Sequence, residues 1–166
     1  MMKKVAIVVL MALLVCLFSA CPAQGDPDAI ENNRPEQEGT TNEQDEVTEM
    51  YITIYGNKLE VTLENNSSVS ALVELLEQGD ITYTADDYGG FEKVGSIGRT
   101  LPTNNSKITT EAGDVVLYQG NQICIMVGSN SWSYTRIGKI KGYSVSELKT
   151  LVGTGKGSAE VTLSLN

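Results

Sequence analysis

The chain has 166 residues, of which 21 are acidic and 12 basic, and it contains no histidine. This length suits one ordinary domain with some residues to spare. The missing histidine excludes a Ser-His-Asp triad, a Cys-His pair and a histidine-based zinc site, so any catalysis would rest on carboxylates, Arg, Lys, Tyr or backbone groups. The net charge of −9 disfavours nonspecific binding to nucleic acid. The sequence predicts neither a cofactor nor a metal site.

Residues 1–21 have the pattern of a bacterial lipoprotein signal peptide. Two lysines precede an apolar run of 14 residues, 5–18, which is too short for a membrane span of about 20 residues but suits secretion. The following Ser-Ala-Cys resembles a lipobox, in which Cys21 would be acylated, although Phe18 departs from the usual leucine. We therefore expect a lipid on Cys21 to anchor the protein on the extracytoplasmic face of the cell membrane. Plain secretion is the alternative.

Residues 22–49 lack the composition of a folded segment. They include nine acidic residues and one arginine, with almost nothing apolar. Such a segment cannot bury enough surface to offset its ordering entropy, so the sequence predicts a disordered, extended tether. An acidic recognition tail is the alternative.

The cysteines predict no disulfide in the domain. Cys16 would leave with the signal peptide and Cys21 would carry the lipid, so Cys124 has no partner. Isoleucine flanks it on both sides and no histidine can act as its base, so we expect a buried structural thiol.

The folded domain is predicted to span residues 50–166. It opens with two alternating runs, 50–55 and 59–63, which predict a hairpin turning at Gly56-Asn57. A helix with an apolar stripe follows and ends at Gly79. A short strand is expected at 81–85.

Residues 86–105 then look irregular. They hold four glycines and several turn formers, and they approach the longest loop that a compact domain usually carries without a function. The side chains in this stretch with chemistry to offer are Tyr88, Phe91, Glu92, Lys93 and Arg99. A loop that only caps one end of a barrel is the alternative.

Residues 113–140 form the best-defined part of the pattern. Two apolar runs, 114–118 and 122–127, predict a hairpin. A polar loop, 128–133, holds Trp132, the only tryptophan, and a strand begins near Tyr134. A capping box at Ser144 starts a second helix, and the alternating run 159–165 is expected to pair with the first strand and close the sheet.

The order of elements and several motifs resemble the cyclophilins. Gln122-Ile123-Cys124-Ile125 is similar to the family's Gln-Phe-Phe-Ile, and Ile137-Gly138-Lys139-Ile140 to its Phe-Gly-Lys-Val. More closely, the chain resembles small bacterial cyclophilin-like domains of uncharacterised function, in motifs such as Asp87-Tyr88-Gly89-Gly90 and Ser133-Tyr134-Thr135-Arg136. The resemblance covers residues 50–166. It implies a mainly β fold, a closed barrel of about eight strands with two short helices.

The resemblance carries over to activity only in part. Cyclophilins isomerise X-Pro bonds, whose rotation barrier is ~18–20 kcal/mol, with an arginine, aromatic rings and a glutamine. Residues 86–105 contain neither the Phe-His-Arg cluster nor the Phe-x-Gln-Gly-Gly stretch that carry such groups. Trp132 lies near the place of the family's pocket tryptophan, Tyr134 stands where the family has a histidine, and Cys124 replaces a pocket phenylalanine.

We therefore expect a domain that binds a peptide or a small molecule. The candidate ligand-binding residues are Tyr88, Arg99, Trp132, Tyr134 and Arg136. Tyr134 and Arg136 would share one face of a strand, and aromatic rings beside a guanidinium suit an extended peptide or an aromatic acid. In the alternative structural interpretation, Trp132 plugs the rim and Arg136 pairs with an acidic residue such as Glu92.

Two enzyme hypotheses also remain. In the first, the protein is a weak peptidyl-prolyl isomerase or cell-surface folding factor, and Arg99 or Arg136 substitutes for the family's arginine. In the second, Asp86, Asp87 or Glu92 acts as acid or base in another reaction, although no second carboxylate lies at a reliable spacing.

Overall fold

The computed structural model describes residues 48–166. The expected signal peptide (1–21) and all but the end of the expected tether (22–49) lie outside the described residues. The strands are β1 (Glu49–Ile54), β2 (Asn57–Leu63), β3 (Ile81–Tyr88), β4 (Glu92–Ser96), β5 (Ser106–Thr109), β6 (Asp114–Tyr118), β7 (Gln122–Met126), β8 (Ser131–Ile140) and β9 (Ala159–Ser164), and the helices are α1 (Ser67–Glu77) and α2 (Val145–Leu151). Within this part of the chain, neither helix is long and apolar enough to cross a membrane.

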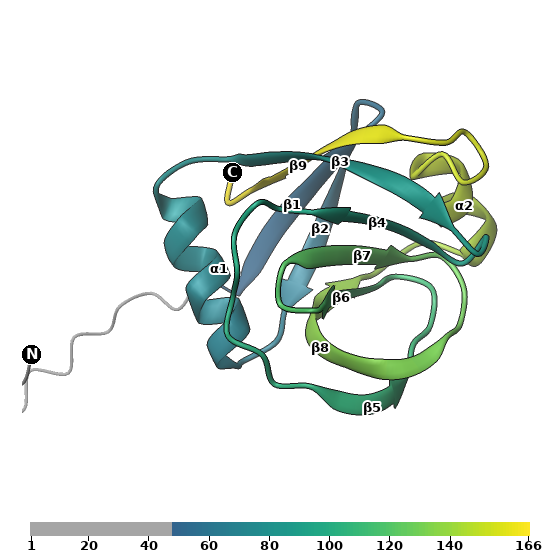
Figure 1. Cartoon of the computed structure of the whole chain (residues 1–166). Helices are drawn as coiled ribbons and strands as arrows, with labels where there is room; N and C mark the ends of the chain where they lie inside the picture. The colour runs from purple at the N-terminus through teal and green to yellow at the C-terminus, as the bar shows by residue number, and fades with distance from the viewer. Residues whose placement is uncertain (1–47) are drawn as a thin grey trace, which may run out of the picture. The chain divides into compact units, whose positions relative to one another are not determined.

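Eight of the strands close into an antiparallel barrel (Figure 1). The order around the barrel is β2-β1-β9-β3-β4-β7-β6-β8, and the pairing of β2 with β8 completes the ring. The ninth strand, β5, pairs with β8 outside the ring. Figure 1 shows α1 at one end of the barrel and α2 at the other. The predicted mainly β barrel of about eight strands with two short helices is therefore confirmed.

The first hairpin and the last strand follow from alternating apolar residues. Ile52 and Ile54 of β1 are buried inside the barrel. The turn comes one residue earlier than expected, because Tyr55 and Gly56 have φ angles of 49° and 75°. Two successive positive φ angles suit the twist of a tight hairpin. β9 pairs with β1 on one side and with β3 on the other, so the predicted pairing of the last strand with the first is confirmed.

Both helices begin at side-chain caps and bury an apolar face. The Asn66 side chain accepts hydrogen bonds from two backbone N–H groups at the start of α1, and Leu72 and Leu76 pack into the main core. At α2, Ser144 and Glu147 form the expected capping box. These contacts satisfy backbone donors that a helix leaves free at its N-terminus.

The prediction of an irregular segment at 86–105 is wrong for its first half. β3 continues to Tyr88, a glycine turn follows, and β4 pairs with both β3 and β7. β4 is not evident from the sequence because it buries two charged residues, Glu92 and Lys93, which interrupt the apolar pattern of a buried strand. The predicted loop at 128–133 is also too long, since β8 starts at Ser131 and Trp132 therefore lies in a strand that pairs with β5.

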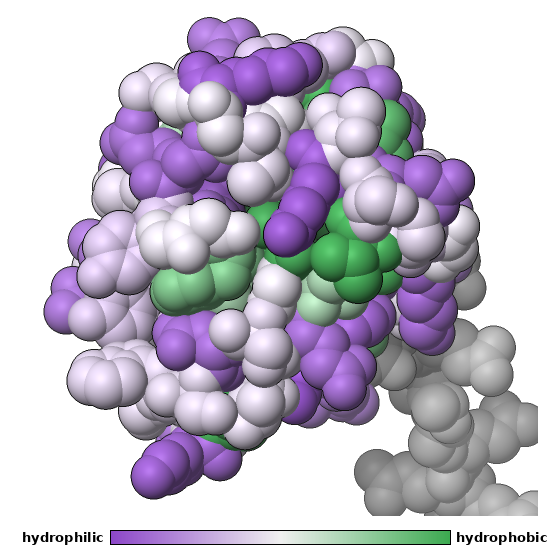
Figure 2. Space-filling model, turned by 90° about the vertical axis from the view of Figure 1, so that its right-hand side faces the viewer, coloured by the Kyte–Doolittle hydropathy of each residue, from purple (hydrophilic) through white to green (hydrophobic). Residues whose placement is uncertain are grey.

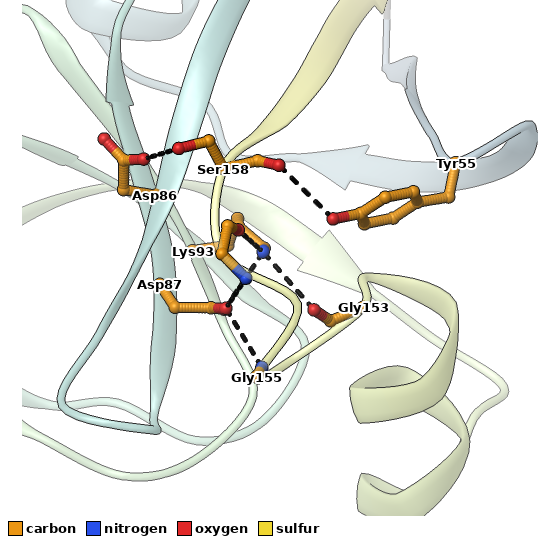
Figure 3. Close-up of polar contacts among 8 residues, drawn as sticks. Tyr55, Asp86, Asp87, Lys93, Gly153, Gly155 and Ser158 are labelled. Atoms are coloured by element: carbon orange, nitrogen blue, oxygen red, sulfur yellow. Dashed lines mark hydrogen bonds and ion pairs between the residues drawn. The ribbon is translucent and has the colours of Figure 1, made fainter.

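Lys93 points toward the α2 end of the barrel, where its side chain is fully buried. Its Nζ donates to the carbonyl oxygen of Gly157 at 2.7 Å and lies 3.0 Å from Oδ1 of Asp87 (Figure 3). Oδ2 of Asp87 accepts the N–H groups of Gly155 and Gly157 at 3.0 and 2.9 Å. Partial burial alone would raise the pKa of Asp87, but the hydrogen bonds from Lys93, Gly157 and Gly155 outweigh it and hold this pKa below its ordinary value. The buried ammonium group is thus fully partnered.

The strands β4, β7, β6 and β8 carry apolar side chains on both faces. Ile123 and Ile125 of β7 point into the main core of the barrel. On the outer face, a second cluster contains Val116, Cys124, Met126 and Tyr134. These apolar side chains on the outer face form the base of the pocket described below.

Candidate ligand-binding site

A pocket of about 570 Å³ lies over the outer face of the barrel. We call it the aromatic pocket, and its lining residues are Tyr88, Phe91, Glu92, Val94, Tyr118, Gln122, Asn130, Trp132 and Tyr134. They come from the β3–β4 hairpin, the β6–β7 hairpin and the start of β8. Small-molecule sites in proteins usually have volumes between about 300 and 1,000 Å³, so the pocket is large enough for a small ligand.

Strand register places these residues on one face. Val94 of β4 pairs with Cys124 of β7, which pairs on its other side with Val116 of β6. Paired residues of antiparallel strands point to the same face of a sheet, and so do residues two apart along a strand. Glu92 therefore stands on the same outer face as Val94, while Lys93 between them points the opposite way.

Aromatic side chains form the walls of the pocket. The rings of Tyr118 and Tyr134 meet edge to face with centroids 6.0 Å apart, and the Asn130 side chain donates to the Tyr134 hydroxyl at 2.9 Å. Tyr88 and Trp132 are 63% and 55% exposed. Both rings line the pocket and are largely exposed, so Trp132 is not buried as a plug, contrary to the alternative structural interpretation.

Two glycines allow the ring of Phe91 to sit at the edge of the pocket. Gly89 has a φ of +59°, and a Cβ there would collide with the ring of Phe91. A Cβ at Gly128 would lie 2.9 Å from Cβ of Phe91. The carbonyl oxygen of Phe91 also accepts the N–H of Val127 at 2.7 Å. A side chain at either glycine would displace Phe91 and change the pocket.

Glu92 places a carboxyl group among the aromatic rings. The residue is 7% exposed, and its Oε2 has no hydrogen-bond partner among the described residues. Burial raises the pKa of Glu92, and the neighbouring Cys124 thiol offsets part of this shift. Burial and the negative charge of Glu92 raise the pKa of Cys124 in turn. Cys124 is thus a neutral buried thiol, as its sequence context predicts.

The structure brings together three of the five predicted site residues. Tyr88, Trp132 and Tyr134 line the aromatic pocket, but Arg99 lines a separate hollow beside the end of α1. Arg136 pairs with an acidic residue, as in the alternative structural interpretation, but its partner is Asp114, with Oδ2 at 3.5 Å, and not Glu92. Whether any of the five binds a ligand stays a prediction.

Sequence reasoning missed several members of the pocket. The sequence suggests Glu92 only as a possible acid or base or as a partner of Arg136, and Phe91 only as a loop aromatic. Tyr118, Gln122 and Asn130 were not singled out. The position of Tyr118 and Gln122 at the ends of two paired strands could have indicated that they lie together. Glu92 and Phe91 could be placed in the pocket only after β4 was recognised as a strand.

The other carboxylates considered for catalysis are engaged elsewhere. Asp87 is bound to Lys93, and Asp86 accepts a hydrogen bond from the hydroxyl of Ser158 (Figure 3).

Among residues 48–166, no group of three or more cysteine, aspartate or glutamate side chains could hold a metal ion. Figure 2 shows the side that carries α2, where pale and hydrophilic residues surround an apolar patch.

Two solved structures resemble this fold. The solution structure of the hypothetical protein AF2241 from Archaeoglobus fulgidus matches with a TM-score of 0.52 and 17% identity, over 72% of this chain and 95% of that one. The structure of McbB in complex with tryptophan matches with a TM-score of 0.50 and 15% identity, over 69% of this chain. The match spans 44% of the McbB chain, less than half its length. At these identities the likeness shows the fold alone.

No curated protein matches the sequence. A family model does match, and it covers residues 52–164, which include the barrel from β1 to β9 and every residue of the aromatic pocket. The chain therefore belongs to the Cyclophilin-like family.

Proposed function

We propose that the domain binds a small molecule or a short peptide segment in the aromatic pocket. The observation that carries this proposal is the combination of a pocket of about 570 Å³ with two largely exposed rings, Tyr88 and Trp132, at its edge. Large exposed aromatic rings bordering a concave site with a few polar groups are typical of ligand-binding pockets. Glu92, Gln122 and Asn130 supply the polar groups here.

One of the similar structures supports this proposal at the level of the fold. The McbB structure is described as a complex with tryptophan, so a protein that shares this fold over part of its length holds an aromatic amino acid. A ligand of that size suits the volume of the aromatic pocket.

We also propose that lipid on Cys21 holds the protein on the extracytoplasmic face of the cell membrane. The support is the apolar run at 5–18 followed by Ser-Ala-Cys. Two or more acyl chains give stable anchoring, since each buried CH₂ contributes about 0.8 kcal/mol. Cys21→Ser should abolish metabolic labelling with a fatty-acid analogue and move the protein out of the membrane fraction. Unchanged labelling and fractionation would contradict the anchor.

The only tryptophan in the chain provides a direct test of ligand binding. The purified full chain is titrated with L-tryptophan, phenethylamine, 3-phenylpropionate and an Ala-Pro-containing tetrapeptide, and binding is followed by NMR amide shifts. For the probes without indole, Trp132 fluorescence gives a second signal. We expect at least one probe to shift residues 88–94, 118–122 and 130–134.

Variants locate the binding. Trp132→Ala should weaken it, whereas Tyr143→Ala should not, because Tyr143 is 42% exposed and lies outside the aromatic pocket. If no probe causes shifts, or if the shifts map to another surface and ignore Trp132→Ala, the proposed function is wrong.

The isomerase alternative is tested separately with an NMR exchange assay on an X-Pro peptide. Neither Arg99 nor Arg136 lines the aromatic pocket, so catalysis by a substituted arginine would need a different surface. Isomerisation that falls with Arg99→Ala or Arg136→Ala would favour the enzyme. If the protein causes no isomerisation above the background rate, the isomerase alternative is wrong and the proposed binding function stands.

A further inference from the structure

We propose that the ligand of the aromatic pocket is an organic cation, a primary or secondary ammonium compound whose N–H group pairs with the carboxylate of Glu92. This inference rests on the proposed function and adds the chemical class of the ligand. It differs from the aromatic acid, one of the two ligand types that the sequence suggests, because the structure puts a carboxylate at the site and leaves both candidate arginines outside it.

One oxygen of the buried Glu92 carboxylate lacks a hydrogen-bond partner in the described part of the chain, and the neighbouring Cys124 thiol supplies no positive charge. Glu92 is only 7% exposed, and its Oε2 accepts no hydrogen bond from the described residues. No Lys or Arg nitrogen among these residues lies within 4.0 Å of its carboxylate. An ionised group buried without a partner is strongly unfavourable. Glu92 is one of the residues that line the pocket, so a ligand whose donor reaches its carboxylate would supply the missing hydrogen bond.

The groups that face Glu92 from the surrounding elements carry no positive charge. They are Cys124 of β7, Tyr134 of β8, Tyr118 of β6 and Tyr88 of β3. Lys93, the next residue along β4, points to the opposite face and is bound to Asp87 and Gly157. The only formally charged side chain that lines the pocket is therefore negative.

The aromatic walls favour a cation for a second, independent reason. The rings of Tyr118, Tyr134, Phe91 and Trp132 line the same pocket as the carboxylate. A cation held over an aromatic face gains about 0.5–1 kcal/mol at exposed sites and about 2 kcal/mol when desolvated. An anion would instead meet the negative faces of the rings and the charge of Glu92.

The unpartnered Oε2 of Glu92 also favours one class of cation over another. A quaternary ammonium group satisfies the rings but has no N–H to donate to Oε2 of Glu92. A primary or secondary ammonium group can do both, and a charge-assisted hydrogen bond is roughly twice as strong as a neutral one. We therefore expect the ligand to carry at least one N–H.

The test uses four probes of similar size on the purified full chain: phenethylamine, N,N,N-trimethylphenethylammonium, 2-phenylethanol and 3-phenylpropionate. Binding is measured by Trp132 fluorescence and by calorimetry. Phenethylamine should bind best, the quaternary and neutral probes about tenfold more weakly, and the anion least. Glu92→Gln keeps the shape of the side chain and should weaken phenethylamine about tenfold while leaving 2-phenylethanol unchanged. Glu160→Gln, an exposed carboxylate on β9 outside the pocket, is the matched control.

The pH dependence gives a second readout. Phenethylamine stays protonated through neutral pH, so its affinity should rise with pH as Glu92 ionises, and this rise should vanish in Glu92→Gln. An affinity that falls with rising pH would mean that the protonated carboxyl group recognises the ligand, and would overturn the cation proposal.

The outcomes separate this inference from the proposed function. If 2-phenylethanol or 3-phenylpropionate binds in the pocket better than phenethylamine, the ligand class is wrong and the binding function stands. Equal binding of phenethylamine to the wild type and to Glu92→Gln has the same meaning. If none of the four probes binds and the probes of the earlier titration also fail, both proposals are wrong.

Discussion

Glu92 and Lys93 are neighbours on β4, and both are buried, yet they have opposite surroundings. Lys93 points toward the α2 end of the barrel and has Asp87 and two backbone carbonyl groups as partners. Glu92 points to the outer face, where Oε2 has no partner in the described part of the chain. A buried charge with complete partners is tolerated in the fold and becomes costly when one partner is removed, whereas a buried charged group without them marks a place where something else is expected to bind.

The largest effect should come from Lys93→Met. The change removes the donor to the carbonyl groups of Gly153 and Gly157 and the partner of Asp87. Removing one member of a buried ion pair typically costs about 3–5 kcal/mol. Since Asp87 keeps two backbone donors, we expect a loss of about 3 kcal/mol. Urea unfolding of the full chain would measure it.

Lys107→Met is the control for this change, because Lys107 is exposed on β5 and its loss should be close to neutral. The β3–β4 hairpin and the segment 153–158 should also lose amide protection in Lys93→Met. An equal and small effect of both lysine variants would contradict the structural role of Lys93.

Glu92→Gln should change stability in the opposite direction. Burial holds the pKa of Glu92 above its ordinary value of 4.5, so folding stability falls as the pH rises from that value through the pKa of the folded state. The amide cannot ionise and avoids this loss. We expect the variant to gain about 1 kcal/mol at neutral pH and nothing below the ordinary pKa.

Thermal unfolding of the wild type and of Glu92→Gln across this pH range would check the sign. A Glu92→Gln chain that is less stable than the wild type at neutral pH would mean that the ionised carboxylate already has a partner in the unliganded protein. That result would weaken the comparison between the two faces of β4.

The sequence predicts the fold well wherever local signals agree. The alternation in β1 and β9 and the capping box at Ser144 give the right elements, and the closing of the barrel follows from them. β4 escapes prediction because two buried charges interrupt its apolar pattern. Besides Asp87, the partners of Lys93 are the carbonyl groups of Gly153 and Gly157, about 60 positions along the chain, and no local pattern shows them.

The candidate site was predictable only in part, for a related reason. Tyr134 and Arg136 do share a face of β8, since Arg136 pairs with Val116 of the outer cluster. Strand alternation does not show, however, where a long side chain ends. The guanidinium lies near Asp114 at the start of β6, away from the rings, and this position follows from tertiary contacts alone.

The smallest effect should come from Arg136→Ala. The Arg136 side chain is 42% exposed and lies 3.5 Å from Asp114, which already has Lys139 at 2.8 Å. Because the guanidinium is partly exposed and the buried Asp114 keeps Lys139, we expect a stability change of at most about 0.5 kcal/mol and unchanged binding of phenethylamine. Denaturant unfolding and the fluorescence titration measure both. If Arg136→Ala lost most of its binding while its stability stayed unchanged, Arg136 would contact the ligand. An acidic ligand would then be favoured over the cation proposed to pair with Glu92.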